Sequence, residues 1–391
     1  MIVGISGYIG ERKTGIGRNL ENVLVRMAKA NQSDIFYLFT NFDQHDYRTV
    51  DWPENVRPIY YKVSCKSPIL NILWHQFFFQ YNLKKFRCDC CLIPNFSLLL
   101  WKVVPTTVVI SDLIEFIIPA KFSKLRVLYR RVIVPLMARN SERIITISQS
   151  SKDDIVKFTH VDARKIAIAL CSHDANFFNK KKKLEVETLL NEYSLVPNSY
   201  LLYVGTVDHP GKNLFSLLEA YLELKEEKKI DKKLVIIGNP GHQYEFIHQT
   251  IMNCKHKEDI KILGFIEDAK LPFFYAGASL FCFLSLYEGF GLPVLEAMAC
   301  GCPVMSSSRS SMPEVAGDAA MFVDPMNIKM IKEVVARIVT TPELQEKLIE
   351  KGLSRAKQFD WSISANIYYD VLKSTIDSSD RRDLNHNREI G

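Results

Sequence analysis

Short apolar runs alternate with amphipathic stretches along almost the whole chain. In the first half, the runs that predict buried strands cover residues 2–6, 35–40, 91–93, 107–111 and 143–148. In the second half they cover residues 201–205, 234–238, 260–265, 279–285 and 303–306. Strands that are apolar throughout and separated by amphipathic helices indicate parallel sheets with helices on both faces. The pattern therefore predicts an α/β protein with two doubly wound parallel sheets.

The alternation is interrupted once, near the middle of the chain, by a lysine run and a polar, acidic stretch. A length of 391 residues also favours two domains. We expect an N-terminal domain over 1–178, a linker over 179–198 and a C-terminal domain over 199–360. A last helix over 361–376 is expected to cross back to the first domain. The polar residues 377–391 lack apolar periodicity, which predicts a disordered tail.

Composition narrows the class of protein without naming an activity. Hydrophobic residues make up 47% and charged residues 24% of the chain, which is typical of a globular protein. No apolar run approaches the ~20 residues of a membrane-spanning helix, and the first residues resemble a strand rather than a signal peptide. The nine cysteines are odd in number, and Cys88 and Cys91 have no second pair to complete a zinc site. We expect reduced thiols, no metal and a cytoplasmic protein.

Charge is distributed unevenly along the sequence. Residues 1–170 hold 24 Lys and Arg against 14 Asp and Glu, whereas the remainder holds 26 against 30. A basic first half favours an anionic partner, such as a phosphorylated lipid or an anionic membrane face. No nucleic-acid-binding motif is present, so we expect no nucleic acid as a partner.

Arg126, Arg130 and Arg131 form a helical stripe that suits lipid headgroups or a solvated face. The aromatic run 74–79 is interpreted as core, and His75 as a packing or cleft residue.

Ligands of open parallel sheets bind at the carboxyl ends of the strands, so the loops there are the candidates. Gly15 and Gly17 lie between the first strand and the first helix, where backbone can approach a ligand closely. A second loop, 205–213, resembles a P-loop only superficially, because five residues separate Gly205 from Gly211 where four are required. Its Lys212 lies at a predicted helix start and suits a phosphate, although a surface lysine is the alternative.

The third loop, within residues 285–303, carries the most information. Backbone amides of 290–292 open a helix and favour an anion, while Glu288 and Glu296 flank the same place. Carboxylates would repel a phosphate but can accept hydrogen bonds from vicinal hydroxyls of a sugar or ribose. A nucleotide sugar combines a diphosphate with hydroxyls at each end. The alternative, a helix cap at Glu296 and a solvated Glu288, leaves the rest of the loop unexplained.

This loop resembles the Glu-x7-Glu signature of the group 1 retaining glycosyltransferases (family four), which have the GT-B fold. The resemblance continues through residues 306–320, through the Gly-Thr…Lys-Asn-Leu pattern of 205–214, and through Thr14-Gly15-Ile16-Gly17. It implies two Rossmann-like domains that face each other across a cleft. The pattern of 205–214 is similar to that of enzymes that extend bacterial O-antigen, capsule and exopolysaccharide chains, often mannosyl- or rhamnosyltransferases.

The resemblance also implies roles for individual residues. Glu288 would contact hydroxyls of the transferred sugar, Glu296 the ribose, and Lys212 the diphosphate. The donor would further meet, by the same resemblance, Gly15, Gly17, Gly205, Thr206, Gly264, Phe265, Ile266, Gly289, Phe290, Gly291 and Leu292. Ser111 and Asp112 stand where many relatives carry His-Asp, and a serine can donate a hydrogen bond but cannot act as a cation.

The resemblance implies a metal-independent transfer of a hexose, with mannose from GDP-mannose favoured, and no cofactor. The implied acceptor is a polyprenyl-diphosphate-linked oligosaccharide at the inner face of the cytoplasmic membrane, with peripheral membrane association. Two alternatives stay open at this point. One is a catalytically weakened nucleotide-sugar-binding subunit, which Ser111 favours, and the other is a nucleotide-sugar epimerase of similar architecture.

Overall fold

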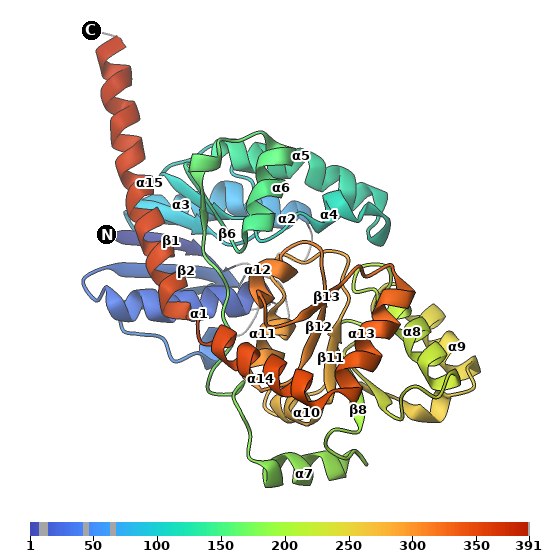
Figure 1. Ribbon diagram of the computed structural model, residues 1–391. Coiled ribbons are helices and arrows are strands. Elements are labelled where there is room, and N and C mark those ends of the chain that lie inside the picture. The colour runs from blue at the N-terminus through green and yellow to red at the C-terminus, as the bar shows by residue number, and fades with distance from the viewer. Residues whose placement is uncertain (8–14, 42–46, 63–67, 390–391) are drawn as a thin grey trace. The chain divides into compact units, whose positions relative to one another are not determined.

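The computed structural model describes residues 1–7, 15–41, 47–62 and 68–389, and the chain divides into two compact units (Figure 1). Unit 1 comprises Met1–Phe116, Lys124–Cys171 and Trp361–Gly391, and unit 2 comprises Ile117–Ser123 and Ser172–Asp360. Thr14 and the other residues of 8–14 lie outside the described residues. In the part of the chain that is described, no helix is both long and apolar enough to cross a membrane.

Unit 1 is built on a seven-stranded parallel sheet of order β3-β2-β1-β4-β5-β6-β7. Its strands are β1 (Ile2–Ser6), β2 (Ile35–Asn41), β3 (Val56–Tyr61), β4 (Cys90–Ile93), β5 (Thr106–Val109), β6 (Arg143–Thr146) and β7 (Ile166–Ile168). Its helices are α1 (Gly15–Ala30), α2 (Pro68–Leu73), the π-helix η2 (Trp74–Phe79), α3 (Gln80–Lys85), α4 (Ile114–Ile117), α5 (Lys124–Asn140), α6 (Gln149–Thr159) and α15 (Trp361–Glu389), with short 3-10 turns η1 (Tyr47–Thr49) and η4 (Ala163–Lys165).

Unit 2 is built on a six-stranded parallel sheet of order β10-β9-β8-β11-β12-β13. Its strands are β8 (Tyr200–Val204), β9 (Lys233–Ile237), β10 (Ile260–Gly264), β11 (Leu280–Phe283), β12 (Val304–Ser307) and β13 (Met321–Val323). Its helices are α7 (Lys183–Glu192), α8 (Leu214–Glu226), α9 (Tyr244–Asn253), α10 (Leu271–Gly277), α11 (Leu292–Ala299), α12 (Met312–Ala316), α13 (Ile328–Thr340) and α14 (Pro342–Ala356), with 3-10 turns η3 (Pro119–Lys121) and η5 (Lys257–Asp259).

The two sheets confirm the predicted architecture of two Rossmann-like parallel-sheet domains. Their central strands are buried on both faces, as the continuous apolar runs require. In unit 1 the helices α1 and α15 pack together over one face, while α3, α5 and α6 cover the other (Figure 1). In unit 2, α8 and α13 pack together, as do α11 and α14. Each sheet thus has a hydrophobic core of its own.

Five segments differ from the expectation. The strands β3, β7 and β13 were not predicted. The stretch 179–198, expected as a linker, contains α7 and belongs to unit 2, where Tyr193 packs edge-on against Phe274 with ring centroids 5.0 Å apart. The tail expected to be disordered from residue 377 is helical as far as Glu389. Extending an existing helix costs far less than starting one, so a polar sequence can continue a helix that packing has nucleated.

The helix α15 completes unit 1 through polar as well as apolar contacts. Its Tyr368 hydroxyl donates to Asn19 Oδ1 at 3.1 Å, and Thr375 Oγ1 lies 2.7 Å from Thr107 Oγ1 on β5. Arg143 at the start of β6 donates to Ser374 Oγ at 3.1 Å. These partners are more than 200 residues apart in sequence, so the last helix is an integral layer of the unit formed by the first 171 residues.

Candidate active site

The strand order of unit 2 reverses between β8 and β11. From β8 the chain proceeds outward to β9 and β10, and from β11 it proceeds the other way to β12 and β13. Loops at the carboxyl ends of the two central strands therefore diverge to opposite faces of the sheet, which is where open α/β sheets bind ligands. Residues 205–213 follow β8, and residues 284–291 follow β11.

The loop after β8 presents Lys212 from a buried support. Asp208 has a fully buried side chain whose Oδ1 accepts the Lys212 backbone N–H at 2.7 Å. The other oxygen, Oδ2, accepts Lys121 Nζ at 2.5 Å. The next residue, Asn213, is buried with a left-handed backbone and donates through Nδ2 to Pro325 O at 2.7 Å. These contacts fix the backbone on both sides of Lys212 while its ammonium group stays partly exposed.

Lys212 and Glu288 form an ion pair across the point where the strand order reverses. The distance from Lys212 Nζ to Glu288 Oε1 is 2.5 Å, and both side chains are partly exposed, at 23% and 16%. The backbones of the two loops are also joined, because Leu286 N–H donates to Gly211 O at 3.0 Å. A cation for a phosphate and a carboxylate for hydroxyls are therefore held side by side.

Two serines hold the backbone around Glu288. Ser310 Oγ donates to Glu288 O at 2.5 Å and accepts the Glu288 N–H at 3.2 Å. Ser311 Oγ lies 3.0 Å from Glu288 O and 2.8 Å from Phe290 O. Both serines precede α12, so a segment after β12 stabilises the loop after β11. Side chains thus satisfy backbone groups that a loop of this kind would otherwise leave to water.

The start of α11 requires a glycine. Gly291 is the residue before the helix and has φ of 106°, in the region that favours glycine, and an added Cβ would lie 2.3 Å from Met312 Cε. Pro293 lies in the first turn, where its missing N–H costs nothing. The amides of Phe290, Gly291 and Leu292 therefore lie at the positive end of an eight-residue helix.

Glu296 lies one turn into α11 and is buried. Its Oε2 accepts a hydrogen bond of 3.2 Å from the Tyr275 hydroxyl on α10. Burial and the neighbouring Glu296 carboxylate raise the pKa of Tyr275 well above its usual value, so the hydroxyl keeps its proton and donates. Because α11 begins at Leu292, Glu296 begins the second turn of this helix.

The sequence of unit 2 matches the family model described as "Glycosyl transferases group 1" over residues 192–355. The chain is 34% identical to O-antigen chain mannosyltransferase B of Escherichia coli over 272 residues, which cover 68% of this chain and 70% of that protein. The chain belongs to the group 1 glycosyltransferases.

A further relative is consistent with this membership, and a solved structure shows the fold. A serotype-specific mannosyltransferase, WbdA of Escherichia coli, is 27% identical over 62% of this chain and 30% of its own greater length. Sucrose-phosphate synthase from Thermosynechococcus elongatus superposes with a TM-score of 0.76 at 16% identity, over 97% of this chain and all of that one. The glycosyltransferase has the GT-B architecture, and the epimerase alternative is wrong.

In unit 2 of the glycosyltransferase, the structure brings some of the predicted residues together. Lys212 and Glu288 are in direct contact. Thr206 O accepts a 2.7 Å hydrogen bond from the buried Tyr203 hydroxyl, whose pKa is raised by burial and by the charges of Asp208 and Glu288. Gly205, Thr206 and Gly289 belong to the same two loops.

The predicted base-binding segment lies at the edge of the same sheet. Gly264 ends β10 with φ of 66° and open space around it, and its carbonyl accepts the Gly238 N–H at 2.8 Å. The Phe265 side chain is largely exposed, whereas Ile266 is buried. The role of these three residues in base binding stays a prediction.

In unit 1 the predicted site residues are less closely connected. Gly15 is exposed at the start of α1, and Gly17, two residues later, is buried. Ser111 and Asp112 follow β5 and are partly buried, and Asp112 Oδ1 accepts the Ile114 N–H at 3.2 Å. This bond gives Asp112 a local structural role at the start of α4. Their roles toward a donor stay predictions.

His75 is a packing residue. Its Nε2 lies 2.9 Å from Ser6 Oγ, at the end of β1, and Nδ1 lies 2.9 Å from Asn71 O. Burial lowers the pKa of His75 to about 4, so the ring is neutral at pH 7. The run 74–79 is only partly core, because Trp74 and Phe79 are buried whereas Phe77 and Phe78 are exposed.

The cysteines behave as buried thiols. Burial raises the pKa of both Cys88 and Cys91 to about 12, which keeps them protonated and poor metal ligands. Among the described residues, no group of three His, Cys, Asp or Glu side chains is placed to hold a metal ion.

Sequence reasoning missed the residues that support the site. Asp208, Ser310, Ser311 and Tyr275 each contact a predicted residue or its backbone. Asp208 and the serines lie inside the stretches that carry the family resemblance, so their polarity next to Lys212 and Glu288 was an available signal. Tyr275 carries no such signal, because a tyrosine in an apolar helix is typical of core.

Proposed function

We propose that this glycosyltransferase moves mannose from GDP-mannose, with retention at the anomeric carbon, to a hydroxyl of a growing surface polysaccharide. The observation that carries the proposal is the Lys212–Glu288 ion pair at the point of reversal in unit 2. The names of the two relatives, both mannosyltransferases, favour mannose, and one names an O-antigen chain as its product. The proposed acceptor is an oligosaccharide linked to a polyprenyl diphosphate.

Donor binding would exchange the ion pair for contacts to the substrate. Lys212 would turn its ammonium group from Glu288 Oε1 to the diphosphate, and Glu288 would accept hydrogen bonds from hydroxyls of the sugar. The amides at the start of α11 would add their dipole to the field of Lys212. Charge develops on the diphosphate as the sugar departs, so a preorganised cation and amides lower the barrier most at that stage.

Glu296 would fix the nucleoside end of the donor. Its Oε2 accepts the Tyr275 hydroxyl, which orients the carboxylate toward the ribose hydroxyls that it would bind. Gly264, Phe265 and Ile266 would meet the base. Gly15, Gly17, Ser111 and Asp112 of unit 1 would contribute to the sugar and diphosphate, and Ser111 would donate a hydrogen bond where many relatives use a histidine. The transfer proposed here needs no divalent ion.

The experiment that tests the proposal follows sugar transfer by the purified protein. GDP-mannose, UDP-glucose and a dTDP sugar are each supplied with a polyprenyl-diphosphate oligosaccharide, with and without a chelator. We expect transfer from GDP-mannose alone, unaffected by the chelator, and an α-configured product in the NMR spectrum. Preferred transfer from another donor would refute the choice of mannose, and a β-configured product would refute retention.

A matched pair of variants separates catalysis from folding. Glu288→Gln keeps the shape of the side chain but removes the charge that pairs with Lys212, and we expect transfer to fall by about 10²-fold or more. Glu333→Gln, at an exposed position of α13, serves as a control with unchanged transfer. Transfer at the unaltered rate by Glu288→Gln would contradict the role of this carboxylate. Donor binding without transfer by the unaltered protein would instead support the weakened subunit that Ser111 favours.

A further inference from the structure

Unit 1 exposes a large apolar surface that its own fold does not explain. Three segments form it: residues 68–85 (α2, η2 and α3), the loop 94–105 between β4 and β5, and α5. These segments hold more than half of the large apolar side chains that are exposed in the described chain. We call this surface the apolar face; its exposed members are Leu70, Ile72, Leu73, Phe77, Phe78, Tyr81, Leu100, Trp101, Val103, Leu125, Leu128, Tyr129, Val132 and Leu136.

The loop of the apolar face is held firmly against η2 and α3. Gln76 is buried, donates to Leu98 O at 2.6 Å and accepts the Leu100 N–H at 2.9 Å. Gln80 repeats this pattern one turn later, with Trp101 O at 2.6 Å and the Val103 N–H at 3.2 Å. Two buried side-chain amides therefore satisfy backbone groups of the loop, and the side chains of Leu100, Trp101 and Val103 are exposed.

Aromatic rings of the apolar face lie side by side where the loop 94–105 meets η2. The rings of Phe77 and Trp101 are 5.5 Å apart in an edge-on arrangement, and both side chains are about half exposed. Tyr81 follows on the same helical face and is 64% exposed. Exposed phenylalanine and tryptophan side chains held in fixed positions are unusual on a surface that faces water alone.

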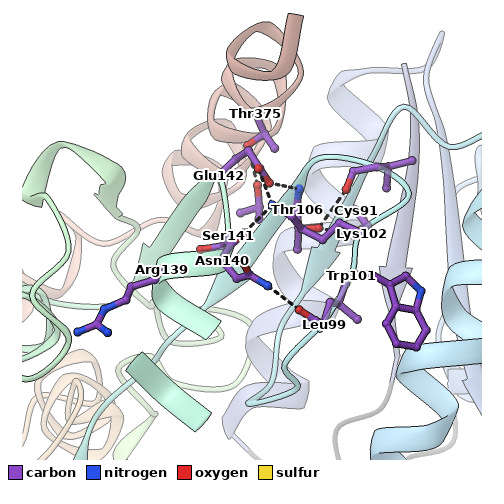
Figure 2. Close-up of polar contacts among 12 residues, drawn as sticks. Cys91, Leu99, Trp101, Lys102, Thr106, Arg139, Asn140, Ser141, Glu142 and Thr375 are labelled. Carbon is purple, nitrogen blue, oxygen red and sulfur yellow. Dashed lines mark hydrogen bonds and ion pairs between the residues drawn. The ribbon is translucent and has the colours of Figure 1, made fainter. Parts of the chain in front are cut away.

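The other side of the loop is attached to α5. Asn140 Nδ2 donates to Leu99 O at 2.8 Å, and Lys102 Nζ contacts Asn140 O and Glu142 Oε1 at 2.5 and 2.6 Å (Figure 2). The Trp101 ring lies apart from this network in the same view (Figure 2). Arg130 of α5 also covers the Phe96 ring at 3.6 Å. The loop is therefore a neighbour of both helical segments of the apolar face.

The helix α5 is apolar on two sides. Val127, Val134 and Met137 are buried in the core of unit 1. Leu125, Leu128, Tyr129, Val132 and Leu136 follow one another at intervals of three, one, three and four residues, which places them on one helical face, and all are exposed. Leu125 is 80% exposed and Leu128 is 62% exposed. A second apolar stripe on a helix that already has a core face indicates a partner outside unit 1.

Charge indicates the chemistry of that partner. Residues 68–85, 94–105 and 124–140 contain no Asp or Glu, and their lysines and arginines include Lys84, Lys85, Lys124 and Arg131, all exposed. Arg126 and Arg130, expected to belong to the lipid-facing stripe, instead contact the buried Glu115 at 2.8 and 3.3 Å. Of that stripe only Arg131 is left to meet an outside anion, together with the three lysines.

We propose that the apolar face docks on the surface of an anionic phospholipid bilayer, with its aromatic and leucine side chains in the interface and its cations at the headgroups. Exposed Trp and Tyr side chains suit the boundary between headgroups and acyl chains, and lysines and arginines beside them attract anionic lipid. The face lies on the membrane and does not cross it, consistent with the helix lengths described above. An acidic protein or a second copy of this chain is the competing occupant.

Docking on the membrane would increase the supply of acceptor to the active site. A polyprenyl diphosphate keeps its oligosaccharide within reach of the membrane surface, so an enzyme held there meets acceptors at raised local concentration. This consequence rests on the proposed function, but docking itself rests only on the surface. Lipid binding is therefore measured without donor or acceptor, and donor binding is measured separately by thermal shift with GDP-mannose, so that either can fail alone.

The first measurement uses Trp101 as a reporter. The chain has four tryptophans, of which Trp74 and Trp361 are buried and Trp101 is about half exposed. We expect phosphatidylglycerol vesicles to shift the fluorescence emission to shorter wavelength, phosphatidylcholine vesicles to do so weakly, and added salt to reverse the shift. Trp101→Phe keeps the surface apolar, so it should co-sediment with phosphatidylglycerol vesicles as the parent does while losing most of the shift.

Matched variants then test the surface by co-sedimentation. Leu100→Ser with Leu128→Ser should lower the partition coefficient about tenfold or more, whereas Met252→Ser on α9, about half exposed in unit 2, should leave it unchanged. Lys84→Glu with Lys85→Glu should likewise lower binding to phosphatidylglycerol about tenfold or more, whereas Lys255→Glu with Lys257→Glu should not. Circular dichroism with unaltered thermal midpoints establishes that each variant is folded.

Three outcomes would overturn the proposal. The first is that the unaltered protein fails to bind phosphatidylglycerol vesicles at low salt. The second is that Leu100→Ser with Leu128→Ser binds them as well as the parent. The third is that the parent forms a dimer, by sedimentation velocity, that the same substitutions abolish, since this would assign the apolar face to a second copy of the chain.

Discussion

Unit 1 and unit 2 fold by the same plan but differ in what lies where the strand order reverses. In unit 2, the ends of β8 and β11 carry Lys212 and Glu288, which are charged and partly exposed. Among the described residues of unit 1, Ser6 ends β1 beside β4 and contacts His75, which is buried and neutral. The sheet therefore supplies the position, and the side chains placed there differ between the described parts of the two units.

Their outer surfaces differ in the opposite sense. Unit 1 has the apolar face with exposed cations, and the described helices of unit 2 carry only scattered exposed apolar side chains. Unit 2 thus has its charged site residues at the carboxyl edge of its sheet. Unit 1 has its exposed apolar side chains on the apolar face. The four predictions below test this contrast.

Removing Lys212 should have the largest effect. Lys212→Ala deletes the cation beside Glu288 while the backbone contacts to Asp208 and Asn213 remain, and we expect kcat to fall by about 10²–10³-fold. Steady-state transfer kinetics measure it. Lys332→Ala is the control, because Lys332 also makes short ion pairs, to Glu223 and Glu227 at 2.6 Å, but on the surface of α13. Equal losses in both variants would contradict a special role for Lys212.

The buried histidine of unit 1 should make stability depend on pH. The pKa of His75 is about 4 in the folded protein against about 6.5 when unfolded, so between these values the unfolded chain binds more protons. The contribution of His75 to the free energy of unfolding is about 3 kcal/mol and is complete above pH 6.5. It is lost as the pH falls toward 4.

Unfolding in urea at pH 7 and at pH 4.5 measures this dependence. His75→Gln should lower the stability at pH 7 yet flatten the fall between the two pH values. His160→Asn, at an exposed residue that ends α6, should leave the fall unchanged. A fall as steep in His75→Gln as in the parent would assign the pH dependence to other groups.

Removing one hydroxyl should have a moderate effect on donor binding. Tyr275→Phe deletes the 3.2 Å hydrogen bond to Glu296 without changing the shape of the core, and a hydrogen bond to a charged group contributes about 1.5–3 kcal/mol. We expect KM for the donor to rise about tenfold with kcat nearly constant, because the ribose is remote from the reacting carbon. Tyr221→Phe, which removes a buried hydroxyl that bonds to Lys232 O, is the matched control. A fall in kcat with constant KM would place Tyr275 in the chemical step.

The smallest effect should come from unit 1. Ser111→Ala removes a neutral hydrogen-bond donor, which costs about 1 kcal/mol, so we expect transfer to fall only several-fold. Transfer rates with saturating donor measure it, and Ser123→Ala, an exposed residue before α5, is the control. A loss as large as that of Lys212→Ala would show that the two units share the catalytic work equally.

The architecture was predictable from sequence, except at the sheet edges. Central strands such as β4 and β8 are apolar on both faces and give an unambiguous run. The three strands that were missed, β3, β7 and β13, are all at sheet edges, and β3 contains Arg57 and Pro58 in a half-buried segment. An edge strand pairs on one side only, so it tolerates a proline and lacks a continuous apolar pattern.

The candidate site was predictable as separate motifs, but its supports were not. Lys212 and Glu288 were identified because loops after parallel strands meet at one edge of a sheet. Their 2.5 Å contact joins residues 76 positions apart and depends on the register of β8 with β11. Tyr275 reaches Glu296 from another helix, and nothing in its local sequence distinguishes it from a core tyrosine. Contacts between residues that are far apart in the sequence produce no periodic pattern from which they could be predicted.

The route of the chain through α15 has a consequence for biosynthesis. The polypeptide leaves unit 1 after Cys171 and returns to it at Trp361, once nearly all of unit 2 has been made. The partners of Asn19, Thr107 and Arg143 on α15 are translated last. During synthesis, unit 2 can therefore fold before unit 1 is complete. A nascent chain stalled before residue 361 would then hold a finished second lobe and an uncovered first sheet, which is the species that chaperones would meet.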